Sequence, residues 1–271
     1  MHRSFLPPAA KGVSGHDVAG RLGLFVLKLA DLTAAALSRQ ILGGKPQRVR
    51  AERATTSKMP KDSGEFDQAK FDAMVSSQSW LLRGFTFYAK YHWDPINQLI
   101  HMCCIWPILF SAIVLFADIP LPESVVAQIP AAVVEAVPFR MDNVGFVVAV
   151  AYFLWHFTLS FSIGAVANCL VIACLIGSDA WHANYPETLP AYAWALHIGC
   201  WIAQFYGHGV HEQRRPALLE NLFASVFMAP IFVVIEGLCA AGFMPEFHAK
   251  LTAVVEPEVR HFHAQRKAKS S

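Results

Sequence analysis

Apolar stretches separated by polar loops dominate the chain after a polar, basic N-terminal region. Asp94 and Pro95 form the pattern of a helix N-cap followed by proline at the first helical position, so a helix is predicted from Pro95 to about Phe116. Further apolar stretches occupy residues 144–177, 191–206 and 217–243, and loops rich in proline and acidic residues separate them at 117–142 and 178–190. Because a membrane-spanning helix needs about 20 mostly apolar residues, this pattern predicts membrane helices.

Two of the apolar stretches leave the number of membrane segments open. As one straight helix, residues 144–177 would reach about 51 Å, beyond a hydrocarbon core of about 30 Å. Two helices folded back near residues 156–162 are therefore predicted. Residues 217–243 are interrupted by Pro230 and are interpreted as a second hairpin, after a polar turn at 207–216. Two hairpins give six membrane segments and two single helices give four, and the hairpins are favoured because they place the basic segments on one side.

The predicted fold is therefore all-α, a polytopic membrane helical bundle with four to six membrane-embedded segments. The membrane domain is assigned to residues 76–243, after a basic polar region at 1–75 and before a tail at 244–271. Residues 22–42 are apolar but carry Lys28, Asp31 and Arg39, which favours a surface amphipathic helix. A cleaved targeting segment is the alternative for this basic, acid-poor region.

Composition and charge narrow the class of protein. Hydrophobic residues make up 55% of the chain and charged residues 15%, against about 25% charged residues in soluble domains. This excludes a disordered chain, a coiled coil and an ordinary soluble enzyme, and a net charge of +2 does not indicate a nucleic-acid partner. The basic segments predict that both termini are cytosolic. Lys267 and Lys269 resemble a dilysine retrieval signal of endoplasmic reticulum membrane proteins, with an ordinary basic tail as the alternative.

Histidines are the candidates for chemistry, because imidazole is the commonest metal ligand and is costly in a membrane without a partner. Asn97 and His101 share one helix face, and His92 precedes that helix. A second group is spaced by four, three, four and three residues and forms one stripe that should face inward: His197, Trp201, Gln204, His208 and His211.

The second stripe and the position of Glu236 each raise a difficulty. His197 and His208 lie about 16 Å apart on a straight helix, so they bind one ion together only if the helix breaks, near Gly199 or Gly207. Glu236 lies in an apolar stretch and needs a partner, and we expect it to hydrogen-bond His197.

Three motifs resemble those of a known family. They are Tyr91-His92-x-x-Pro95-x-Asn97-x-x-Ile100-His101, Trp201-x-x-Gln204-Phe205-x-Gly207-His208-x-x-x-Glu212-x-Arg214-x-Pro216-Ala217-Leu218 and Ala229-Pro230-x-Phe232-x-x-x-Glu236. The resemblance covers about residues 80–243, and the family is that of the iron(II)-dependent 2-hydroxy fatty acid dioxygenases of endoplasmic reticulum membranes. These enzymes act in fatty acid α-oxidation during phytosphingosine breakdown.

The resemblance implies Fe(2+) as cofactor, with O2 and a 2-hydroxy fatty acid that is shortened by one carbon with release of CO2. It implies metal ligation by His92, His101, His197 and His208, and catalytic roles for Asn97, Gln204, Glu212 and Glu236. An aromatic residue is expected in place of His211, so His211 is either an extra ligand or a ring-shaped substitute. We expect Arg214, Arg215 or Lys90 to steer the substrate carboxylate, with anchoring at the cytosolic surface as the alternative role.

Three other functions are compatible with parts of the sequence. A membrane di-iron hydroxylase or desaturase would need dense histidine boxes, of which only His208-x-x-His211 is present. A haem electron carrier would use His101 and His197 as axial ligands. A membrane transporter or scaffold predicts a histidine stripe along a pathway without iron, and metal analysis would separate it from an enzyme.

Overall fold

The computed structural model describes residues 67–216 and 222–270, and the helix expected at 22–42 lies outside this part. The described residues are helical, apart from short loops and an isolated β-bridge between Pro120 and Asn143, which confirms the all-α prediction. In chain order, the helices are α2 (Gln68–Ser76), α3 (Trp80–Ala89), α4 (Pro95–Phe116), α5 (Glu123–Val126), α6 (Ala131–Ala136), α7 (Val144–Leu159), α8 (Phe161–Asn184), α9 (Leu189–Tyr206), a π-helix (Gly207–Glu212), α10 (Leu222–Ala240) and α11 (Pro245–Ser270).

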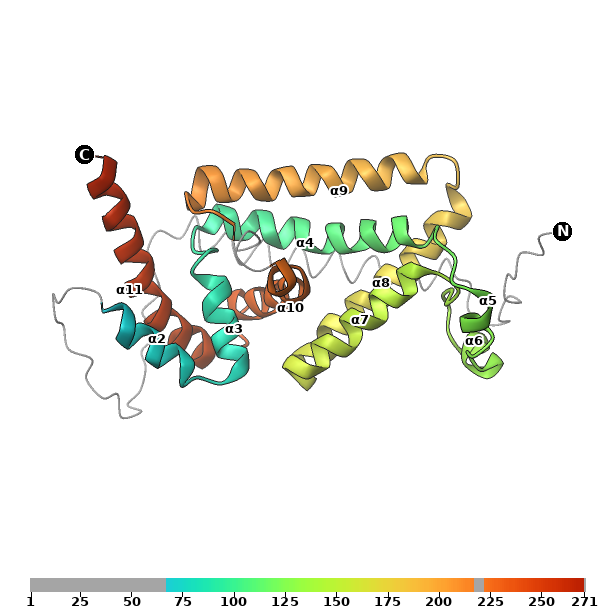
Figure 1. The fold of residues 1–271 in the computed structure, drawn as a ribbon, viewed down its shortest axis with the longest axis horizontal. Coiled ribbons are helices and arrows are strands. Elements are labelled where there is room, and N and C mark those ends of the chain that lie inside the picture. Colours follow the sequence, from blue (N-terminus) through green and yellow to red (C-terminus); the bar gives the residue numbers. More distant parts are fainter. Residues whose placement is uncertain (1–66, 217–221, 271) are drawn as a thin grey trace.

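Helices α4 and α9 form the central antiparallel pair and lie side by side along most of their length (Figure 1). The start of α4 is as predicted, because the Asp94 side chain accepts hydrogen bonds from the backbone amides of Ile96 and Asn97. Val114 of α4 packs against Leu189 and Ala193 of α9, and all three are buried. This packing holds the two helices in fixed register, so their polar residues meet at one end.

The hairpin predicted at 144–177 is confirmed, with its break at Ser160 between α7 and α8. A side chain at Gly164 would lie 2.6 Å from the backbone oxygen of His156, so glycine permits the tight approach of the two helices. Asn168 of α8 accepts a hydrogen bond of 2.9 Å from His156 of α7. Helix α8 continues to Asn184, so the loop expected at 178–190 is shorter than predicted.

The second predicted hairpin, at 217–243, is wrong. Pro230 lies inside one helix, α10, because Ala229, Ile231 and Phe232 around it are buried against the other helices. The chain turns later, where Gly242 adopts a φ of +83° and hydrogen bonds run from Gly242 to Cys239 and from Phe243 to Leu238. This is the Schellman motif that commonly ends helices. Helices α10 and α11 meet there at 110°.

Helix α11 returns to pack on α2 and α3 (Figure 1). Leu251, Val255 and Val259 are buried in the same cluster as Phe85 and Phe232, so most of the segment interpreted as a tail is a packed helix.

By length and composition, two helices of the described part, α4 and α8, can cross a membrane. A third span results if α10 and α11 count as one bent segment, and α7 is apolar but has only 16 residues. The four to six membrane segments predicted from the sequence are thus not confirmed.

Candidate metal centre and substrate cavity

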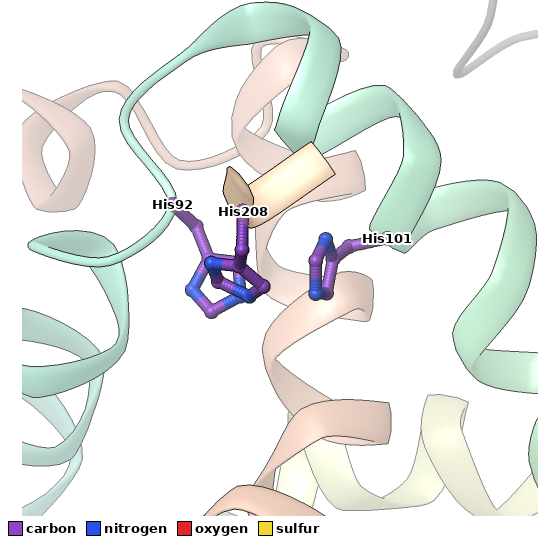
Figure 2. A group of neighbouring side chains, drawn as sticks. All are labelled: His92, His101 and His208. Carbon is purple, nitrogen blue, oxygen red and sulfur yellow. The ribbon is translucent and has the colours of Figure 1, made fainter. Parts of the chain in front are cut away.

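Three histidines from separate parts of the chain converge at one end of the α4–α9 pair. His92 lies in the turn between α3 and α4, His101 on α4 and His208 on the π-helix, and Figure 2 shows their rings grouped around one point. Their ring centroids are 4.3 to 4.9 Å apart, and one nitrogen from each lies within 4.8 Å of the others. All three are buried.

Hydrogen bonds orient two of these rings. His92 Nδ1 lies 2.9 Å from the Tyr88 carbonyl oxygen, and His101 Nδ1 lies 2.9 Å from the Asn97 carbonyl oxygen. A carbonyl only accepts, so each Nδ1 carries the proton and each Nε2 keeps a free lone pair. His208 Nδ1 is buried and has no hydrogen-bond partner within the described residues. The group therefore presents lone pairs that no other group of the described residues uses.

The surroundings keep the imidazoles of His92 and His208 neutral. Burial, and then the neighbouring rings of His101 and His208, hold the pKa of His92 well below its ordinary value. Burial and His101 lower the pKa of His208 to about 3. Neutral imidazole is the form that binds a metal.

These residues fit a metal ion. Metal–imidazole bonds are about 2 Å long, so nitrogens within 4.8 Å of one another need only a small inward adjustment. A carbonyl oxygen behind a ligating histidine is the usual outer partner that fixes its tautomer. Three protein ligands also leave coordination positions for substrate, and an all-imidazole set suits iron, zinc, copper or nickel.

Glu212 connects the two parts of the chain that carry His92 and His208. One of its oxygens accepts hydrogen bonds of 2.9 Å from the backbone amides of Trp93 and Asp94, and the Asn97 side-chain amide lies 3.2 Å away. Burial raises the pKa of Glu212, and these three donors oppose that rise. Among the described residues, its contacts are those of a residue that positions the histidines.

The prediction of a polar turn at 207–216 is wrong for the first half of this segment. Residues Gly207–Glu212 continue α9 as a π-helix, which ends where Gln213 adopts a left-handed conformation with a φ of 57°. Single π-helical turns are frequent at functional sites. The helix does not break at Gly207, so the condition for His197 and His208 to share an ion is absent.

His197 accordingly lies outside the histidine group. Its Nε2 accepts a hydrogen bond of 3.1 Å from the Trp201 indole, so its Nδ1 carries the proton and donates to the Ser111 hydroxyl at 2.9 Å. Ser111 donates in turn to the Ile108 carbonyl. Both ring nitrogens are thus occupied, which leaves no lone pair for iron or haem. His211 is also outside the group and contacts the Tyr206 ring.

The partner expected for Glu236 is also wrong. Its carboxylate accepts a hydrogen bond of 3.2 Å from the Tyr88 hydroxyl instead of one from His197. Tyr88 stacks on His92 with ring centroids 3.9 Å apart and 13° between the ring planes. Glu236 therefore reaches the site through Tyr88, which sequence reasoning missed, although it lies one helical turn before His92.

None of the three expected carboxylate-steering cations lines the cavity beside the histidines. Arg214 donates two hydrogen bonds to Glu258 of α11 and lies 4.4 Å from the rings of Tyr91 and Phe262. Lys90 lies over the rings of Phe87 and Tyr91, and Arg215 is exposed. Arg214 thus fastens α11 beside the site.

An apolar cavity of about 340 Å³ extends from the histidines between α4, α7, α9 and α10. The inward direction predicted for the stripe on α9 is confirmed for His197, Trp201, Gln204 and His208, which all line the cavity. Gln204 is 5% exposed, and its side-chain nitrogen has no hydrogen-bond partner in the described part of the chain. The site therefore combines a histidine group that can hold a metal ion, an amide donor without a partner among the described residues and a long apolar interior.

Comparison with known proteins gives a concordant result. Residues 80–239 match the model of the Mpo1-like family, described as 2-hydroxy-palmitic acid dioxygenase Mpo1-like. The chain is 31% identical to the 2-hydroxy-palmitic acid dioxygenase MPO1 of Saccharomyces cerevisiae over 180 residues, which cover 66% of this chain and 92% of the yeast protein. No solved structure matches. With a family match that spans all three histidines and both walls of the cavity, the chain belongs to the Mpo1-like family.

Proposed function

We propose that this protein is an iron(II)-dependent dioxygenase that shortens 2-hydroxy fatty acids by one carbon. The observation that carries the proposal is the placement of three histidines with free lone pairs at one end of a long apolar cavity. This arrangement suits an amphipathic substrate whose polar end lies at the metal and whose alkyl chain lies in the apolar part. The name of the yeast relative, a 2-hydroxy-palmitic acid dioxygenase, indicates the same class of substrate.

The proposed reaction balances without a further reductant. A 2-hydroxy fatty acid and O2 give the fatty acid one carbon shorter, CO2 and water, because the bond between C1 and C2 breaks and C2 becomes the new carboxyl carbon. This four-electron oxidation of the substrate matches the four-electron reduction of O2. Iron(II), when bound by His92, His101 and His208, supplies the activation of O2 and a binding point for the substrate's hydroxyl and carboxylate.

The other residues of the site orient the histidines and select the substrate. The carbonyl groups of Tyr88 and Asn97 fix the ligand tautomers, and Glu212 fastens the π-helix to the start of α4. Gln204 offers its unpaired amide to the polar end of the substrate. A buried donor without a partner is costly, so a substrate oxygen that satisfies it is favoured over an alkyl group.

The proposed setting is the endoplasmic reticulum membrane, with residues 76–243 as the catalytic domain and both termini in the cytosol. Trp194, Ile198 and Ile202 project from the outer face of α9 and are more than half exposed, which suits contact with membrane lipid. A glycosylation tag at the C-terminus tests the orientation. Modification of this tag in the lumen would refute it.

The decisive experiment is anaerobic purification of the full chain with iron(II), followed by incubation with a 2-hydroxy fatty acid and O2. Stoichiometric iron, a product one carbon shorter and equimolar CO2 are expected. Retention of iron without product would reject the reaction. A protein that binds no iron, zinc or copper would indicate the transporter or scaffold function instead.

A further inference from the structure

The wall that α4 contributes to the cavity is one continuous face of that helix. Each of its residues lies three or four positions from another member of the face: His101, Ile105, Ile108, Leu109, Ala112 and Phe116. At a rise of 1.5 Å per residue, Ala112 lies about 16 Å and Phe116 about 22 Å beyond the level of His101. The cavity is therefore elongated along α4, with the metal-binding histidines at one end.

The distal part of this cavity meets α7. Gly145 of α7 lies against the backbone of Ile113 and Ala117, and Tyr152 packs in one cluster with Leu109 and Ile113. Val148, between these two positions on α7, lines the cavity. This places the first turns of α7 beside the last turns of α4.

Few polar groups line the cavity beyond the histidine end. His197 uses both of its ring nitrogens on Ser111 and Trp201, and the Tyr152 hydroxyl donates to the Val226 carbonyl. Ser225 adds one hydroxyl, which has no hydrogen-bond partner within the described residues. Ala112 carries the smallest side chain of the α4 wall, and its methyl group leaves open the space that a larger residue would fill. The distal part thus suits the unbranched end of an alkyl chain.

We propose that the space between Ala112, Phe116 and Val148 receives the methyl end of the substrate's alkyl chain, and that Ala112 sets the longest chain accepted. This inference rests on the proposed function, since it assigns the substrate's polar end to the histidines. Each methylene buried in the distal part strengthens binding by about fourfold. Substrates whose alkyl chains reach Ala112 should therefore bind more tightly than substrates with shorter chains.

The substitution Ala112→Phe tests the proposal by shortening the cavity. We expect the ratio of kcat/KM for a sixteen-carbon over a ten-carbon 2-hydroxy acid to fall by about tenfold or more, the equivalent of two methylenes left unburied. Activity on the ten-carbon acid should fall less than activity on the sixteen-carbon acid, because the shorter chain ends before Ala112. Val148→Phe, on the opposite wall, should also lower the ratio. It replaces Ala112→Phe as the test if Ala112→Phe does not fold.

Ala195→Phe is the matched control, because Ala195 is exposed on α9 and does not line the cavity. It introduces the same side chain and should leave the chain-length ratio unchanged. An unchanged ratio in both Ala112→Phe and Val148→Phe would overturn the proposal, and so would an equal change in the control.

Photo-crosslinking gives a second readout that needs neither turnover nor metal. A saturated fatty acid with a diazirine at its methyl end, added to the unmodified protein, should label peptides that contain Ala112, Phe116 or Val148. Labelling confined to peptides around Tyr88 and His92 would reject the orientation. If distal labelling occurs but no 2-hydroxy acid is consumed, the proposed reaction fails while the alkyl site stands. Turnover without distal labelling would reject the alkyl site while the proposed reaction stands.

Discussion

The Glu212 carboxylate accepts a hydrogen bond of 3.2 Å from the Asn97 side-chain amide, across the junction of the π-helix and α4. The same oxygen also accepts from the backbone amides of Trp93 and Asp94. His92 precedes these amides by one and two residues, and His208 lies one turn before Glu212. A single buried carboxylate therefore holds the two chain segments at the spacing that brings the histidines together.

Replacement of Glu212 by alanine should loosen the metal centre without removing a ligand. The part-buried amides of Trp93 and Asp94 lose their acceptor, and the buried Asn97 amide keeps only the Tyr91 carbonyl. Each donor left unsatisfied costs about 1–3 kcal/mol when buried. We expect a clear fall in the melting temperature and a metal affinity lower by roughly 10- to 100-fold, the usual effect of losing an outer-shell partner. Thermal melting and metal titration measure both. Glu187→Ala, at an exposed position, is the control, and equal behaviour of the two variants would contradict the positioning role.

The histidine group predicts a sharp division among single alanine variants. His92→Ala, His101→Ala and His208→Ala should each lose bound iron and turnover, by more than the 10- to 100-fold of an outer-shell change. His197→Ala and His211→Ala should retain iron, because neither belongs to the group. Metal content measured after gel filtration distinguishes the three variants that should lose iron from the two that should retain it. Loss of iron in His197→Ala at unchanged melting temperature would restore it as a ligand.

Tyr88 and Glu236 should behave as one unit toward His92. Tyr88→Phe keeps the stacked ring but removes the hydroxyl that donates to Glu236, and Glu236→Gln replaces the carboxyl group by an amide of the same shape. We expect each change to weaken iron binding by up to about tenfold, the mild end of outer-shell effects.

Because the two residues share one hydrogen bond, the double variant should be little worse than either single variant. Additive losses of iron affinity would show that Glu236 acts on the site by another route.

Arg214 and Glu258 should contribute to stability and not to substrate binding. Their side chains are 13% and 11% exposed and form a two-bond ion pair. Removing either partner should cost about 3 kcal/mol, the low end of the range for a buried pair that loses one member. Melting temperatures of both alanine variants and of the double variant test this. A rise in KM for Arg214→Ala alone would instead support a role in binding the substrate carboxylate.

Local signals in the sequence predicted the elements that depend on local chemistry. Asp94-Pro95 marked the start of α4, and the length of the uncharged stretch after Val144 required the reversal found at Ser160. Pro230 was misleading because its effect depends on packing. Buried neighbours on both sides keep α10 continuous, and the turn occurs at Gly242, where the positive φ favours glycine.

The sequence predicted which types of residue form the site, but not which residues contact one another within it. Spacing placed His197 and His208 on one stripe, and the structure puts both on the cavity wall. The register of α4 against α9 decides which residues become neighbours. It places the Ser111 hydroxyl at hydrogen-bond distance from His197 Nδ1, and the His101 ring beside the His208 ring. The Tyr88–Glu236 bond joins residues 148 positions apart, and no periodicity within either segment indicates it.

Gly207 provides the most direct test of how closely the π-helix must approach α4. A β-carbon at Gly207 would lie 2.5 Å from the Asn97 side-chain oxygen and 3.2 Å from Ile100 Cδ1, whereas one at Gly209 would meet nothing within 4 Å. Gly207→Ala should therefore displace Asn97 or the π-helix, at a cost of about 1–3 kcal/mol for overpacking.

Displacement of either element should also separate His208 from His101, so Gly207→Ala should lower metal affinity together with melting temperature. Gly209→Ala carries the same change two residues away. It should be neutral or stabilising by up to about 1 kcal/mol, because alanine favours helix over glycine. Equal metal affinity and equal stability in the two variants would mean that the contact between Gly207 and Asn97 does not hold the histidine group together.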